Sequence, residues 1–103
     1  MEQQIREKAD RYVKIMSEIV GTDILAKSRK QDVVWARNIV AYQLFLDGFM
    51  VEPIGKALGL HHSTISYCFK QVVNMLKMPL MYSKEIELWH NFKEILSYEK
   101  DLD

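Results

Sequence analysis

The sequence has little of what several classes of protein require. It contains one cysteine, so no disulfide can form within the chain, and this suits a reducing compartment. Four glycines and two prolines offer too few turns for an all-β fold. No apolar run approaches the roughly 20 residues that a membrane span needs, and residues 1–6 lack the basic-then-apolar pattern of a signal peptide. We therefore expect a cytoplasmic protein with no membrane partner.

Motifs for common cofactor and metal chemistry are missing as well. There is no Gly-x4-Gly-Lys-Ser/Thr loop, no His-Glu-x-x-His and no Cys-x-x-Cys, which excludes the common nucleotide-binding, zinc-protease and zinc-finger interpretations. No carboxylate pair or nucleophile–base spacing stands out either. We therefore expect no enzymatic activity and no cofactor.

Charge is balanced over the whole chain but unevenly distributed along it. The 103 residues include 14 basic and 14 acidic side chains, for a formal net charge of zero. Residues 27–77 hold seven basic and three acidic residues, whereas residues 79–103 hold three basic and six acidic ones. The positive excess in the central part of the chain favours a polyanionic partner such as DNA.

Hydrophobic periodicity predicts a single all-α domain of about six helices and no strand, with 49% hydrophobic residues supplying one core. A segment that begins after the expected N-cap Asp32 is apolar almost all round, so we expect it to be the buried centre. A polar basic loop, 27–31, precedes it. The predicted helices cover about residues 3–20, a short stretch at Ile24 and Leu25, and then about 33–47, 52–58, 62–76 and 83–100.

The most informative stretch runs from Val51 to Phe69 and reads V-E-P-I-G-K-A-L-G-L-H-H-S-T-I-S-Y-C-F. It predicts two short helices joined by a glycine turn. We expect Gly55 to allow the two helices to approach closely and Gly59 to take a positive φ where the chain reverses. Between the helices we expect an apolar wedge of Leu58, Leu60 and Ile65. The inner stripe of the second of these helices is predicted to be Ile65, Phe69, Val72 and Leu76.

This spacing is typical of the helix-turn-helix, in which the start of the second helix meets base edges in the major groove of DNA. The residues at that start are His61, His62, Ser63 and Thr64. They are polar and nearly uncharged, and hydroxyl groups pair with donors or acceptors on bases. Helical bundles that bind no DNA also contain two helices and a glycine turn. The polar helix start and the basic segment around it favour DNA.

From about Tyr12 to Leu76 the chain resembles the C-terminal DNA-binding domain of the bacterial replication initiator DnaA, whose helix-turn-helix is of the Trp-repressor-like type. That family's signature is Gly-Arg-Asp-His-Thr-Thr-Val, and the matching run here is G-L-H-H-S-T-I over residues 59–65. Leu60 and His61 replace the family's arginine and aspartate, and the approach to the turn is one residue shorter. The resemblance implies the family's fold and a role in replication initiation at the nucleoid. The two substitutions weaken the implication that the same DNA box is bound.

Carried over by position, the resemblance implies base contacts from His62, Ser63 and Thr64 and a minor-groove contact from Arg29. An arginine in a narrow minor groove is favoured by its enhanced negative potential. The lysines that flank Arg29 and other basic or hydroxyl side chains are expected to contact the DNA backbone. These predicted backbone contacts are Lys27, Lys30, Arg37, Lys56, Tyr67 and Lys70. For Arg37, a structural ion pair is the alternative.

Three other interpretations were weighed against DNA binding, and the last two remain open from the sequence. Imidazoles and a thiol at His61, His62, Cys68 and His90 suggest a metal site, but adjacent histidines hardly bind one ion together and Cys68 is expected to face inward, so we predict none. Residues 1–78 would form the DNA-binding domain, and the acidic helix in 79–103 would pack on it, or else form a homodimer or bind a protein partner. The last possibility describes an interaction module that has lost DNA binding. A helix-turn-helix transcription regulator unrelated to replication is the third.

Overall fold

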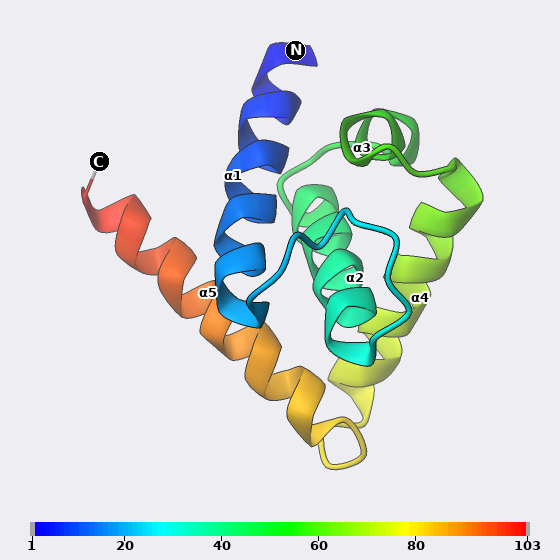
Figure 1. Ribbon diagram of the computed structural model, residues 1–103, viewed down its shortest axis with the longest axis vertical. Helices are drawn as coiled ribbons and strands as arrows, with labels where there is room; N and C mark the ends of the chain where they lie inside the picture. Colours follow the sequence, from blue (N-terminus) through cyan, green and yellow to red (C-terminus); the bar gives the residue numbers. More distant parts are fainter. Residues whose placement is uncertain (1, 103) are drawn as a thin grey trace.

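The computed structural model describes the backbone of residues 2–102 and the side chains of residues 2–99 (Figure 1). Within these residues there is no strand, so the predicted all-α class is confirmed. None of the helices in this part of the chain has the length and apolar character to cross a membrane. The five helices are α1 (Glu2–Val20), α2 (Gln31–Leu46), α3 (Val51–Leu58), α4 (His62–Lys77) and α5 (Ser83–Leu102).

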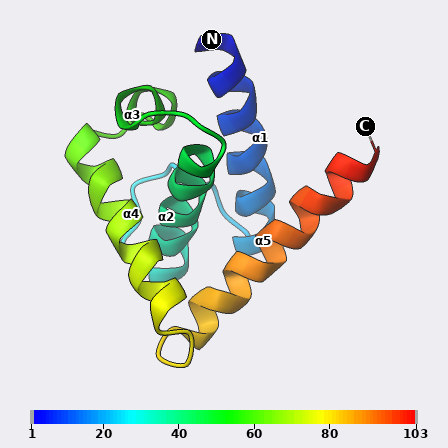
Figure 2. The ribbon, with the colours of Figure 1, turned by 180° about the vertical axis from the view of Figure 1, so that it is seen from behind.

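The central position of α2 follows from its sequence. It is apolar on nearly every face, and it contacts all four other helices. Figures 1 and 2 show it between α1 and α4. The prediction of a buried central helix is therefore confirmed. Its fully buried apolar side chains are Val33, Ala36, Ile39, Val40, Ala41 and Leu44.

The predicted short helix around Ile24 and Leu25 is wrong, and residues 2–102 form five helices where the sequence suggested six. A single turn bond, from the amide of Ala26 to the carbonyl oxygen of Asp23 at 3.2 Å, forms there and is not continued into a helix. The Oγ atom of Ser17 accepts a hydrogen bond from the amide of Ile24 at 3.1 Å, and Oδ1 of Asp23 accepts one from the amide of Leu25 at 3.0 Å. Ile24 is fully buried and anchors this loop to the core.

The predicted N-cap of α2 is also wrong by two positions. Lys30 occupies the cap with an extended backbone and no side-chain capping bond. Asp32 lies in the first helical turn, where its Oδ1 atom accepts the amide of Val33 at 2.8 Å. The carboxylate still lies near the positive end of the helix dipole, which favours a negative charge.

The buried stripe of α4 differs from the predicted one by a rotation about the helix axis. Ile65 and Val72 are fully buried as expected, but Leu76 is 39% exposed and Phe69 only partly buried. Cys68 and Met75 take their places in the core. The run 65, 68, 72, 75 is as regular as the predicted one, and the packing of α4 against α2 selects it. The expectation that Cys68 faces inward is confirmed.

The aromatic residues of α5 only partly cover the core. The ring of Phe92 is fully buried and meets Tyr12 edge-on, with centroids 5.6 Å apart. Trp89 is half-buried beside Tyr42, and Tyr98 is 71% exposed. Figure 2 shows α4 and α5 diverging from the turn that joins them, with α2 between. α5 thus places Phe92 in the core, and partly buried side chains pack against that core on either side of it: Ile86, Leu88, Trp89 and Leu96.

A polar network joins α5 to α1 through the end of α2. The hydroxyl of Tyr12 donates to Oδ2 of Asp47, and Gln43 donates from Nε2 to Oδ1 of the same carboxylate at 3.0 Å. Nζ of Lys93 donates to Oε1 of Gln43 at 2.7 Å. Burial, together with the Asp47 hydrogen bond and charge, raises the pKa of Tyr12, so its hydroxyl remains a donor.

Candidate nucleic-acid interface

The turn between α3 and α4 depends on two glycines, as the sequence predicted. A Cβ atom on Gly55 would lie 2.6 Å from the carbonyl oxygen of Leu60, so only glycine allows this approach. The carbonyl oxygen of Gly55 accepts the amide of Leu60 at 2.8 Å. Gly59 has a φ of 70°, in the left-handed region that glycine adopts without strain. Leu58 and Ile65 are buried beneath the turn.

His61 caps the N-terminus of α4, which the sequence analysis did not foresee. Its Nδ1 atom accepts the amide of Ser63 at 3.2 Å and lies 2.8 Å from the Ser63 Oγ atom. An imidazole nitrogen here takes the place of the carboxylate or hydroxyl oxygen that usually caps a helix. The rings of His61 and His62 lie 4.1 Å apart. The predicted base contact His61 therefore orders the helix start as well.

All four predicted base-contacting side chains, from His61 to Thr64, are exposed. On the next two turns of α4, Tyr67 and Lys70 continue the same face and are also exposed. Ser66, one turn beyond His62, shares this surface, although sequence reasoning missed it; its spacing of four from His62 was the available signal. No acidic residue occurs anywhere in α4. This face combines hydroxyl, imidazole and ammonium groups with no carboxylate from its own helix.

Lys56 lies on α3 close to the start of α4. Its side chain is exposed and borders a shallow depression between the two helices. Glu52 borders the same depression and reduces the positive potential there. The depression has a volume of about 460 Å³, and its lining residues are Glu52, Gly55, Lys56, Gly59, Leu60, His61 and His62.

The basic loop carries the remaining predicted contacts. Lys27, Arg29 and Lys30 are all exposed, and the amide of Lys30 donates to the Oγ atom of Ser28 at 3.2 Å. Arg37 of α2 donates from its guanidinium to the carbonyl oxygen of Ser28 at 2.6 Å. Arg37 is half-buried and holds the loop against α2, a role that neither of the two interpretations from the sequence included.

The thiol and imidazole groups considered for a metal site lie in different environments. Burial raises the pKa of the Cys68 thiol to about 11, while the positive charge of Arg37 opposes that rise. Cys68 is 3% exposed, whereas His61, His62 and His90 all lie at the surface. Among the residues that the structure describes, no three His, Cys, Asp or Glu side chains come together in a way that could hold a metal ion.

Comparison with protein-family models, with curated proteins and with solved structures finds no match to this chain. The functional assignment therefore depends on the residues and geometry described above.

Proposed function

We propose that this protein binds double-stranded DNA in a sequence-specific manner, with α3 and α4 acting as a helix-turn-helix and without catalysis. The observation that carries the proposal is the N-terminal end of α4. It is exposed, polar and free of acidic groups, and it directly follows a turn whose geometry requires glycine at two positions. The major groove of B-DNA, about 12 Å wide, admits such a helix.

In this arrangement, His62, Ser63 and Thr64 contact base edges. Hydroxyl groups pair with donors or acceptors, and the methyl group of Thr64 suits the methyl group of thymine. His61 contributes its remaining ring nitrogen, since Nδ1 already caps the helix. Phosphate contacts from Lys56, Tyr67 and Lys70 fix the position of α4 without reading sequence.

The basic loop contacts the adjacent part of the duplex. Arg29 enters the minor groove, and Lys27 and Lys30 contact phosphates on either side of it. The hydrogen bond from Arg37 to Ser28 supports this role, because it fixes the loop relative to the central helix before DNA arrives. The resemblance to the DnaA domain supports the same division between the loop and α4, and with it an initiator-like role at the nucleoid in the cytoplasm.

The test is a selection of duplexes from a randomised pool at about 50 and 200 mM salt, followed by anisotropy measurements on the recovered sequences. We expect a short box to be enriched and its affinity to fall steeply as salt rises. A single asymmetric box supports the initiator-like mode. Two half-sites about one helical turn apart support a dimeric transcription regulator. No binding at the lower salt concentration contradicts the proposal.

One observation favours a second function, that of a protein-interaction module. In the turn between α4 and α5, Leu80 is 95% exposed and Met81 is 73% exposed. Large apolar side chains exposed together often mark a contact with another protein. This function becomes the leading one if the pool selection recovers no DNA.

A further inference from the structure

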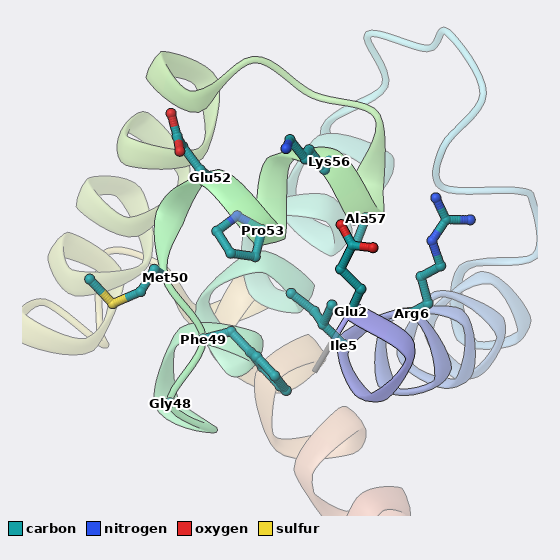
Figure 3. A pocket seen from close by; sticks show the side chains of 10 residues that line it. All are labelled: Glu2, Ile5, Arg6, Gly48, Phe49, Met50, Glu52, Pro53, Lys56 and Ala57. Atoms are coloured by element: carbon teal, nitrogen blue, oxygen red, sulfur yellow. The ribbon is translucent and has the colours of Figure 1, made fainter.

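A cavity lies between the first two turns of α1 and the helix α3 (Figure 3). Its volume is about 260 Å³, slightly below the roughly 300–1,000 Å³ of typical small-ligand sites. Ile5 and Pro53 face the middle of this space from opposite sides, whereas Glu52 and Met50 point away from it. The segment Gly48–Met50 closes one side, and Ala57 completes the wall formed by α3.

The lining combines an apolar floor with charges of both signs. The floor consists of Ile5, Phe49, Pro53 and Ala57. Arg6 and Lys56 border the cavity. The carboxylate of Glu2 points toward it (Figure 3). Among the described side chains, none of these three charged groups forms an ion pair within 4 Å.

We propose that this cavity binds a small zwitterion with an apolar body, such as a free hydrophobic amino acid. The carboxylate of the ligand pairs with Arg6 and Lys56, its ammonium group pairs with Glu2, and its side chain covers the apolar floor. A ligand with only a negative charge would be repelled by Glu2, and a ligand with only a positive charge would be repelled by Arg6 and Lys56. Only a molecule with both charges complements all three rim groups at once.

The proposal also implies a link to DNA, and this part depends on the proposed function. Lys56 lines both this cavity and the depression beside the start of α4. A ligand carboxylate that pairs with Lys56 competes with a DNA phosphate for the same ammonium group. We therefore expect the bound zwitterion to lower duplex affinity about two- to fivefold, the size of an exposed ion pair.

The test is an NMR titration of the ¹⁵N-labelled chain with three probes: phenylalanine, phenylacetate and phenethylamine. These share an aromatic ring and differ in charge. We expect phenylalanine to shift the amides of Ile5, Phe49 and Ala57 with saturation and a dissociation constant on the order of 1 mM. Each probe that lacks one charge should bind about two- to fivefold more weakly. The proposal is overturned if phenylalanine causes no saturable shift, or if the singly charged probes bind equally well.

Two variants locate the site. Ala57→Leu fills the cavity and should abolish the saturable shifts that phenylalanine causes. Amide resonances outside the cavity should keep their positions, which shows that the variant is folded. Arg6→Gln should weaken phenylalanine about two- to fivefold, whereas its control Lys14→Gln, also exposed on α1, should not. Equal binding by Arg6→Gln and the control overturns the assignment. The titration contains no DNA, so failure of the cavity and failure of DNA binding are separate results.

Discussion

Gly55 and Gly59 are both needed in the turn, but for different physical reasons. At Gly55 the space for a side chain is occupied by the carbonyl oxygen of Leu60, which is backbone and cannot move independently. At Gly59 the space is open, and the positive φ alone disfavours other residues. Both requirements could be predicted from the sequence, because a tight turn between two short helices imposes them locally.

We predict that Gly55→Ala destabilises the protein more than Gly59→Ala does. The first substitution forces backbone apart and should lower the free energy of unfolding by about 2–3 kcal/mol. The second places alanine in the left-handed region at a cost of about 1 kcal/mol. Urea denaturation measures both, with Ser66→Ala on exposed α4 surface as the control. Equal losses, or a larger one for Gly59→Ala, would contradict the geometry of the turn.

Cys68 should be unreactive in the folded protein. Its thiol is 3% exposed and has a pKa of about 11, so at pH 8 it is neutral and inaccessible. We expect a disulfide reagent to modify it at pH 8 only as fast as the chain unfolds, and immediately in concentrated urea. Rapid modification without urea would show that this part of α4 is not buried.

The raised pKa of Cys68 also makes the stability of the folded protein depend on pH. Above the thiol's unfolded value of about 8.5, the unfolded chain ionises while the folded chain keeps its proton. The contribution of the Cys68 thiol to the free energy of unfolding is therefore complete below about pH 8.5, and it decreases as the pH rises toward 11. Cys68→Ala should remove this decrease between pH 8.5 and 11, as measured by denaturation at each pH.

The two classes of predicted DNA contact can be separated by substitution. Thr64→Ala should cost about 1–3 kcal/mol on the preferred site and relax sequence preference, because it removes a base contact. Lys56→Gln should weaken binding to all DNA sequences alike, because it removes a phosphate contact. It should also reduce the slope of log affinity against log salt concentration by about one. Anisotropy on matched and scrambled duplexes measures both effects.

Exposed positions away from the interface supply the controls, Ser97→Ala on α5 and Lys14→Gln on α1. A uniform loss for Thr64→Ala would contradict base reading. An unchanged slope for Lys56→Gln would remove that residue from the phosphate contacts.

At the scale of elements, the sequence predicted the long helices well and the connections poorly. The apolar character of α2 is a property of its own residues, so its central place could be inferred. The prediction at Ile24 failed because one turn bond forms there and is not continued, while the Oγ atom of Ser17 binds the Ile24 amide and fixes the loop. Periodicity does not register such bonds. The link from Arg37 to Ser28 was invisible for a related reason, since it joins a side chain to a carbonyl group in another segment.

The face of α4 shows a second limit of sequence reasoning. Its sequence carries two overlapping apolar stripes, and only the position of α2 decides between them. The exposed side was predictable despite this, because the polar residues at the helix start exclude that end from the core.

The aromatic side chains of α5 should contribute unequally to stability. Phe92 is fully buried against Tyr12, whereas Tyr98 is 71% exposed. Phe92→Ala should therefore lower the free energy of unfolding by about 3–5 kcal/mol. Tyr98→Ala should change it by less than about 0.5 kcal/mol. Full stability of Phe92→Ala together with an altered oligomeric state, measured by light scattering, would instead indicate that this helix forms an interface.

At the scale of the whole molecule, zero net charge conceals an uneven distribution of charge along the chain. The basic loop and α4 contribute lysine, arginine and imidazole groups, whereas the last 25 residues carry six acidic and three basic side chains. We expect a duplex that approaches the chain to be attracted by the basic loop and α4 and repelled by the acidic last 25 residues. Orientation of DNA on the protein should therefore follow from charge, and sequence preference from the start of α4.

Binding of DNA by α4 is best tested by an NMR map of the amide shifts that duplex DNA causes at about 50 mM salt. We expect the largest amide shifts at residues 61–67 and 27–30, with Lys56 affected and α5 nearly unchanged. Shifts confined to α5 and to the turn before it, or no shifts at all, would contradict the assignment of α4 as the element that binds DNA.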